Sequence, residues 1–247
     1  AHAGRSAYLP WDIRQVCANT DPAKANAAIL DDLAGGASSV DLVIDDGSGR
    51  GLAEPTALKA ALEGVLLNLA PVAVTAGLRG LDAAQALSAL LPEDAAPAFN
   101  IDPISAWLRH GASSGPIADQ ISAAAMLAQD LFAQFPKGTA LLVSAEGTHE
   151  AGASPAQELA IMLAAAAAYL RAADTDGADP EIVGRMTLTR LSIGPDVIVE
   201  IAKLRAARAL WANLFAACGV TDAPLRLQAV TSRRMLTRDD AWTNILR

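Results

Sequence analysis

The feature that most constrains this chain is a repeated alternation of short apolar stretches with longer helical ones. Six stretches have the length and apolar content of buried strands, and a segment with helix signals follows each of them. The strands are expected at residues 40–44, 71–75, 98–102, 140–144, 186–191 and 225–230. Strands that alternate with helices form parallel sheets, because each helix carries the chain back to the same end of the sheet. The alternation therefore predicts an α/β fold.

Two architectures fit this pattern, a doubly wound sheet and a (β/α)8 barrel of the TIM type. We favour the barrel, with about six of its eight β/α units present in the 247 residues. Residues 1–36 are expected to be an extended, irregular segment followed by a helix, and residues 37–247 the partial barrel. Without two of the strands, those at 40–44 and 225–230 would be open edges, which we expect another chain, a second copy or residues outside this sequence to cover.

Several expected strands carry polar residues where a barrel interior usually holds branched apolar ones. These are Thr75, Asn100, Ser144, Thr187, Thr189 and Gln228. They indicate either an unusually polar barrel interior or strand ends that face the loops, and the pattern favours neither.

The helices have recognisable signals. Ser154 and Gln157 have the spacing of a capping box around Pro155, which predicts a helix from 154 to 172. Further helices are expected at 21–33, 56–69, 83–91, 116–135, 196–218 and from 239 onward. In the helix at 196–218, one buried face is predicted from Val197, Ile201, Leu204, Trp211, Phe215 and Cys218, with Lys203, Arg205 and Asn213 pointing elsewhere.

Composition excludes several functional classes. The net charge is −8 and the only basic cluster is Arg233-Arg234, so no nucleic-acid surface is expected. The longest apolar run, 159–170, is too short to cross a bilayer, so no membrane partner is expected. Cys17 and Cys218 lie outside any cysteine motif, which favours two free thiols in a cytoplasmic protein.

A polar loop after the strand at 140–144 carries the most suggestive chemistry. Glu146, His149 and Glu150 are types that ligate metals or exchange protons, but no His-Glu-x-x-His motif is present. A solvated or hydrogen-bonded loop scaffold is the simpler interpretation. Ser144 lacks the Gly-x-Ser-x-Gly elbow of hydrolases. The glycine-rich stretch 45–51 lacks the spacing of phosphate-binding loops, which favours a flexible loop.

Four segments resemble the adenosylcobalamin-dependent acyl-CoA mutases of the methylmalonyl-CoA mutase family. They are Tyr8-Leu-Pro-Trp-Asp-Ile-Arg-Gln15, the loop 144–152, the helix Glu200-Ile-Ala-Lys-Leu-Arg-Ala-Ala-Arg-Ala-Leu-Trp211, and Thr231-Ser232 with Asn244-x-x-Arg247. The resemblance implies a TIM-type barrel and acyl-CoA isomerisation with adenosylcobalamin. It also implies substrate-binding positions at Arg14, Gln15, Thr231 and Ser232, and it assigns no residue to a metal or to the cofactor.

The departures from the family pattern lie at its reactive positions. A tyrosine of active members is replaced by Val16, their Tyr-His pair by Glu146 and Gly147, and a glutamine by Val230. The resemblance therefore implies the barrel of the small, non-catalytic subunit, which pairs with a catalytic mutase chain or a second copy. Acyl-CoA is expected in the complex, and adenosylcobalamin is not expected to bind this chain alone.

Two other hypotheses stay open. The chain is an active mutase component that receives cobalamin from a separate domain, with His149 as its histidine. Alternatively, it is a metal-assisted barrel enzyme that uses Glu146, His149 and Glu150.

Overall fold

The fold is built on seven parallel strands. The computed structural model describes residues 11–113 and 115–246, so the first part of the Tyr8–Gln15 motif and Arg247 lie outside the described residues. The strands are β1 (Arg14–Cys17), β2 (Ser39–Val43), β3 (Val72–Thr75), β4 (Ala98–Ile101), β5 (Thr139–Ser144), β6 (Thr187–Ile193) and β7 (Arg226–Thr231). Each pairs in parallel with the next, in the order β1-β2-β3-β4-β5-β6-β7.

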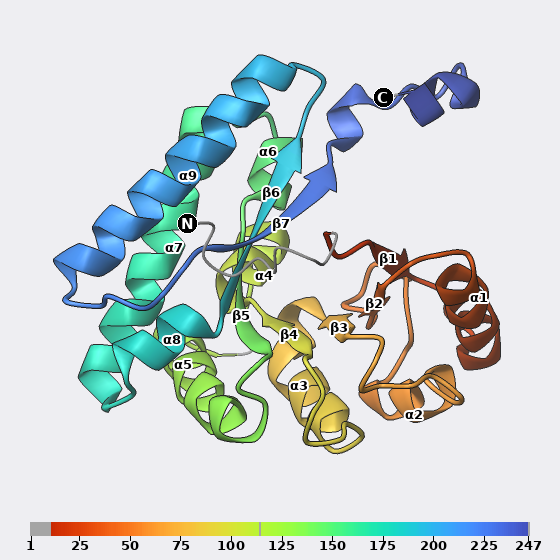
Figure 1. Ribbon diagram of the computed structural model, residues 1–247, viewed down its shortest axis with the longest axis horizontal. Coiled ribbons are helices and arrows are strands. Elements are labelled where there is room, and N and C mark those ends of the chain that lie inside the picture. The colour runs from red at the N-terminus through yellow and green to blue at the C-terminus, as the bar shows by residue number, and fades with distance from the viewer. Residues whose placement is uncertain (1–10, 114, 247) are drawn as a thin grey trace.

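This strictly sequential order decides between the two architectures. A doubly wound sheet reverses its strand order at a switch point, whereas a barrel adds strands in chain order. The strands curl and most of the helices form an arc around them, so the chain is a partial α/β barrel (Figure 1). In the part of the chain that the structure describes, β1 and β7 have one neighbour each and are the edges.

The six expected strands are confirmed within two residues at each end, but the segment before them differs from expectation. Residues 14–17 form β1 rather than an irregular lead-in, and Gln15 pairs with Val40. The open edge expected at residues 40–44 is therefore covered by the chain itself. Four-residue β1 has only Val16 as a typical strand former, which is why the apolar pattern missed it.

The helices connect the strands on the outside of the curl. The longer ones are α1 (Pro22–Ala34), α3 (Gly80–Ser88), α4 (Pro103–His110), α5 (Ile117–Gln134), α7 (Pro155–Asp176) and α9 (Val197–Ala217). Shorter ones are η1 (Pro55–Ala57), α2 (Leu58–Ala61), η2 (Gly77–Arg79), α6 (Glu146–Glu150), α8 (Pro180–Arg185), η3 (Arg233–Met235) and η4 (Ala241–Leu246). None of these helices, within the described residues, is both long and apolar enough to cross a membrane.

Local signals account for the helix boundaries. The capping box of α7 is present, with the Ser154 hydroxyl accepting from the Gln157 backbone N–H and Gly177 ending the helix in a left-handed conformation. The helix expected at 56–69 ends at Ala61, and Gly64 has a φ of 76° that a continuing helix cannot adopt. Helices α4 and α8 were missed because each spans at most eight residues.

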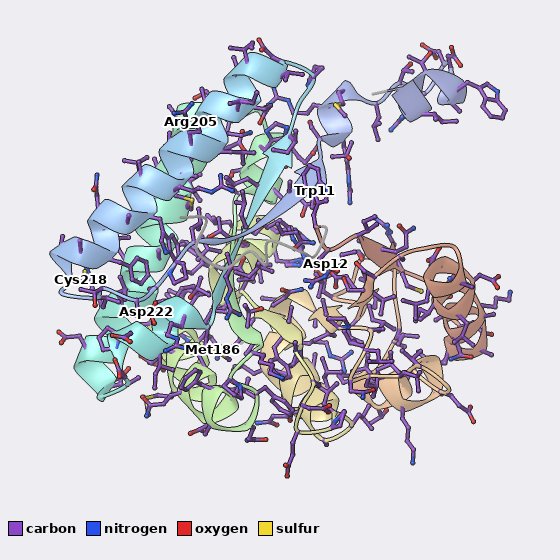
Figure 2. All side chains as sticks on the ribbon, viewed as in Figure 1. Trp11, Asp12, Met186, Arg205, Cys218 and Asp222 are labelled. Carbon is purple, nitrogen blue, oxygen red and sulfur yellow. The ribbon has the colours of Figure 1, made fainter. Side chains whose placement is uncertain are left out.

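The main core lies between the helices and the outer face of the sheet. It is rich in alanine, which lets α5 and α7 approach each other and β5 closely; its larger members include Ile29, Leu42, Phe99, Leu131 and Tyr169. Among the described residues both cysteines are free, as expected; Cys17 is buried, and exposed Cys218 lies just past the end of α9 (Figure 2).

The buried face of α9 differs from expectation in its first half and at Cys218, which is exposed. Trp211 and Phe215 are buried as predicted, but Val197 and Ile201 are 66% and 50% exposed. In their place Glu200 and Lys203 are buried. The apolar pattern was misleading here because the first two turns of α9 pack charged side chains inward, against charged and polar partners.

Candidate functional site

The inner, concave face of the sheet differs from the helix-covered face. Side chains alternate along a strand, so residues next to the main-core positions point inward. Ala73, Ala98, Leu142 and Leu188 form a small buried apolar cluster of their own on this face. Two residues further along β3, β4, β5 and β6, the side chains become polar. The polar layer therefore lies toward the carboxyl ends of the strands, where ligand sites of barrels are built.

Arg190 of β6 is the centre of this polar layer. Its Nη2 donates to the Asp41 Oδ2 of β2 at 2.9 Å, and its Nε donates to the Gln228 Oε1 of β7 at 3.0 Å. The Thr75 hydroxyl donates to the Asp41 Oδ1 at 2.9 Å, and the Asn100 amide donates to the Thr75 oxygen at 3.3 Å. One hydrogen-bonded network thus reaches across the interior from β2 to β7.

The ion pair at the centre of the network is nearly sealed from solvent. Arg190 is 7% exposed and Asp41 is 2% exposed, although 149 residues separate them in the chain. Removing one partner of such a pair leaves an uncompensated buried charge, which costs about 3–5 kcal/mol. The network therefore links β2, β6 and β7 across the interior by bonds that are costly to break.

Asn100 and Asp102 lie at the end of β4. Asn100 has a φ of 48°, in the left-handed region that asparagine tolerates better than most residues, and β4 has a register shift against β5 here. Asp102 caps α4 by accepting from the Ser105 N–H, and it also accepts from the Ser144 N–H. Burial raises the pKa of Asp102 to about 6, against the lowering effect of these hydrogen bonds and of the Arg190 charge.

Glu146 lies at the mouth of the polar layer, on the first residue of α6. Its Oε2 is 3.7 Å from the Arg190 Nη1 and its Oε1 is 4.0 Å from the Arg233 Nη2. Both distances are ion-pair distances and exceed those of hydrogen bonds. The expected polar loop is thus a short helix, and Glu146 faces two guanidinium groups rather than a metal or a histidine.

His149, in contrast, points into a sealed cluster. Its Nδ1 is 2.8 Å from the Glu158 Oε1 of α7, and its Nε2 is 2.7 Å from the Ser232 Oγ after β7. A serine, a histidine and a carboxylate in this order resemble a hydrolase triad. Ser232 is only 1% exposed, however, so no substrate reaches its oxygen. His149 is therefore part of a buried hydrogen-bonded scaffold in this structure.

Lys203 completes this cluster from α9. Its ammonium group is 2.7 Å from a Glu200 oxygen, 3.3 Å from the Glu158 Oε2 and 2.6 Å from the Ser192 carbonyl oxygen. The cluster ties α6, α7, α9 and the end of β7 together. Its charges explain why α9 buries Glu200 and Lys203 instead of Val197 and Ile201.

The metal-assisted hypothesis does not fit this geometry. Both ring nitrogens of His149 have partners, and the Glu150 Oε1 accepts from the Arg233 backbone N–H. Glu146 faces cations, so the three candidates do not converge on one point. No group of three or more potential metal-ligating side chains occurs within residues 11–113 and 115–246.

The four predicted substrate-binding residues are placed differently from one another. Arg14 lies on the inner face, where it donates to the Ser39 and Asp12 side chains. Gln15 pairs with Val40, a main-core residue, so it points to the outer face and is exposed there. Thr231 is exposed at the end of β7, and Ser232 is buried against His149. The structure does not bring the four together.

Asp41 and Arg190 were not singled out from the sequence. Each is a charged residue inside an otherwise strand-like stretch, and two opposite charges buried in parallel strands predict a pair across the interior. Thr75, Asn100, Ser144 and Gln228 are on the inner face, whereas Thr187 and Thr189 pair with Leu141 and Val143 and point toward the helices. The first four therefore agree with a polar interior, whereas Thr187 and Thr189 fit neither interpretation, because they are buried on the helix-facing side of β6.

Comparison with known proteins agrees with the sequential barrel. The sequence profile described as methylmalonyl-CoA mutase matches residues 57–247, which is most of the chain. The chain belongs to the methylmalonyl-CoA mutase family. It is 40% identical over 244 residues to the methylmalonyl-CoA mutase small subunit of Streptomyces virginiae, covering 96% of this chain and 38% of that subunit.

Two further relatives are a small subunit and a large subunit of methylmalonyl-CoA mutases. The probable methylmalonyl-CoA mutase small subunit of Mycobacterium tuberculosis is 33% identical over 252 residues, which cover 98% of this chain and 39% of the relative. The large subunit of Streptomyces virginiae is 35% identical over 125 residues, 48% of this chain and 17% of the relative. The chain spans less than two fifths of the length of these small subunits.

The mutase family is cobalamin-related, but the residues at the mouth of this barrel do not fit the cofactor. Gly147, which the resemblance matched to a histidine of the family, is an exposed glycine with open space around it. His149 has no ring nitrogen free to meet a ligand. Glu146 offers a carboxylate already facing two arginines. No reaction step through cobalamin follows from these residues.

Proposed function

We propose that this chain is a small-subunit-like barrel that supports a catalytic, adenosylcobalamin-dependent acyl-CoA mutase chain in the cytoplasm. On this proposal the complex interconverts methylmalonyl-CoA and succinyl-CoA, while this chain neither binds the cofactor tightly nor performs the isomerisation. The observation that carries the proposal is the inner face: Arg190 is bonded to Asp41 and Gln228 across it, and both reactive candidates, Glu146 and His149, are held by side chains of the same fold.

The relatives support the pairing. Small-subunit relatives align over nearly the whole chain, whereas a large-subunit relative aligns over about half of it. Within the described residues, β1 and β7 each have an edge with unpaired backbone groups, to which a partner strand could add.

The proposal is tested by binding. The purified chain is titrated with adenosylcobalamin, and it is separately mixed with a catalytic mutase large subunit and analysed by size-exclusion chromatography with light scattering. We expect no saturable cofactor binding by the chain alone and a stable one-to-one complex with the large subunit. Tight binding of adenosylcobalamin by the isolated chain, or no complex in a preparation shown to be folded, contradicts the proposal.

The alternative of an active component is disfavoured by the surroundings of His149. A catalytic histidine must reach a substrate proton or carbonyl directly or through one water. Both nitrogens of His149 are within 2.8 Å of buried protein oxygens, so the imidazole cannot reach substrate unless α6 moves.

A further inference from the structure

We propose that Arg190 and Arg233 form a binding site for a small carboxylate anion, and that the side chain of Glu146 occupies this site as an internal stand-in. The inference concerns the isolated chain and does not rest on the proposed mutase function. It begins from the position of Glu146, which points one oxygen at each guanidinium group.

The guanidinium group of Arg190 is held in one orientation before any ligand binds. The hydrogen bonds from its Nη2 to Asp41 and from its Nε to Gln228 fix the plane of the guanidinium group. These bonds leave Nη1 directed at Glu146. A guanidinium group held rigidly loses little freedom when it meets an anion, and its flat fork suits a carboxylate.

Arg233 supplies the second cation from the rim. Its side chain is 62% exposed, so the site opens to solvent on this side. Its backbone N–H donates to the Glu150 Oε1 at 3.0 Å, which ties the start of η3 to α6. One cation is thus buried and fixed, and the other is exposed at the rim, where a ligand can reach it.

The Glu146 carboxylate makes only long contacts with the two arginines. Arginine and carboxylate in a strong pair approach to about 2.7–2.9 Å. The distances of 3.7 and 4.0 Å show that the backbone of α6 holds this carboxylate back from both cations. A free carboxylate is under no such restraint and can approach both groups more closely.

The charge balance favours a carboxylate over a phosphate. Asp41 already neutralises Arg190, so displacement of Glu146 leaves one net positive charge from the two arginines and Asp41. A carboxylate group carries one negative charge and restores neutrality. A phosphate dianion would add excess negative charge close to the buried Asp41, which is costly in a medium of low polarity.

The test uses propionate as the probe, with inorganic phosphate as the comparison, at constant ionic strength in chloride. Binding to the wild type, to Glu146→Gln and to the matched control Glu150→Gln is measured by isothermal titration calorimetry. We expect Glu146→Gln to bind propionate about tenfold tighter or better, because the competing carboxylate is gone while both cations stay. Adding Arg233→Gln to Glu146→Gln should abolish the gain.

Three results overturn the inference: equal affinity of the wild type and Glu146→Gln, an equal gain in Glu150→Gln, and tighter binding of phosphate than of propionate. If Glu146→Gln does not fold, amide hydrogen exchange in the wild type replaces the titration. High propionate must then speed exchange over residues 146–150 relative to chloride, because the displaced Glu146 no longer restrains α6. No change in exchange there also overturns the inference.

Discussion

The barrel contains two charged clusters, one around Lys203 and one around Arg190. They differ in the length of their ion-pair contacts and in their exposure to solvent. The cluster around Lys203 has contacts of 2.6–3.3 Å, and Lys203, Glu158, His149 and Ser232 are all buried. The cluster around Arg190 is tight toward Asp41 and loose toward Glu146, which is partly exposed. Both combine a buried cation with two carboxylates, yet only the second has a contact that an outside group can replace.

The difference shows that clusters built from similar residue types can serve different purposes, depending on how deeply they are buried and how short their contacts are. The Lys203 cluster joins three helices and the end of β7, so it is part of the scaffold. The Arg190 cluster spans the inner face and meets solvent at its rim, so it is where a ligand would first make contact. Four substitutions or conditions test this contrast.

The largest effect is expected from Lys203→Met. It leaves Glu158 and Glu200 without their cation in a buried cluster, which should lower the free energy of unfolding by about 3–5 kcal/mol. Urea denaturation measures this loss. The exposed neighbour Arg205→Gln serves as the control and should change stability by no more than about 0.5 kcal/mol. Equal losses of unfolding free energy in the two variants would contradict the view that the Lys203 cluster stabilises the scaffold.

Asp41→Asn should cost somewhat less, about 2–4 kcal/mol, although Asp41 is as buried as Glu158. Arg190 loses its closest anion but still faces the Glu146 carboxylate at 3.7 Å, whereas Lys203→Met leaves two carboxylates without their cation. The double variant Asp41→Asn with Glu146→Gln should then lose more than the sum of the two single losses. Strict additivity would show that Glu146 gives Arg190 no support.

A pH effect of about 3 kcal/mol is expected from Asp102, because each pH unit between its two pKa values changes the free energy of unfolding by roughly 1.4 kcal/mol. Burial raises the pKa of Asp102 from 3.8 to about 6, so the folded protein holds this proton where the unfolded chain has released it. Raising the pH from about 4 to 6 should therefore reduce this residue's contribution to stability. The free energy of unfolding of Asp102→Asn, measured against the wild type by urea denaturation, should rise across this window. A constant difference would contradict the raised pKa.

The smallest effect is expected from Glu146→Gln. Its contacts at 3.7 and 4.0 Å are long and partly exposed to solvent, so the free energy of unfolding should change by less than about 1 kcal/mol. Glu158→Gln makes the same chemical change in the closed cluster and should cost several times more. Similar losses of stability in the two variants, measured by thermal or urea unfolding, would contradict the difference in burial and contact strength between the two clusters.

The sequence predicted the layered fold well because the strands at β2 to β7 are apolar, regularly spaced and followed by helix signals. It missed β1, whose polar residues join the sheet through backbone pairing with β2 alone. It also placed Val197 and Ile201 in the core, because helical spacing cannot reveal that Glu200 and Lys203 find buried partners on another helix.

The candidate site was predicted only in part. Glu146 and His149 stood out as polar residues after a buried strand, and so did Ser232, but their spacing in the chain says nothing of which way each points. His149 and Ser232 meet across 83 residues, and Arg190 and Asp41 across 149. Such pairs depend on the closure of the barrel, which local sequence patterns do not contain.

The turnover of methylmalonyl-CoA with adenosylcobalamin tests the central claim most directly. The assay compares this chain alone, a catalytic large subunit alone and the two together, with a His149→Ala variant of this chain in parallel. The account predicts no turnover by this chain alone, and turnover by the complex that survives His149→Ala wherever that variant still folds and pairs. Turnover by this chain with the cofactor alone, lost on His149→Ala in a folded protein, would contradict it.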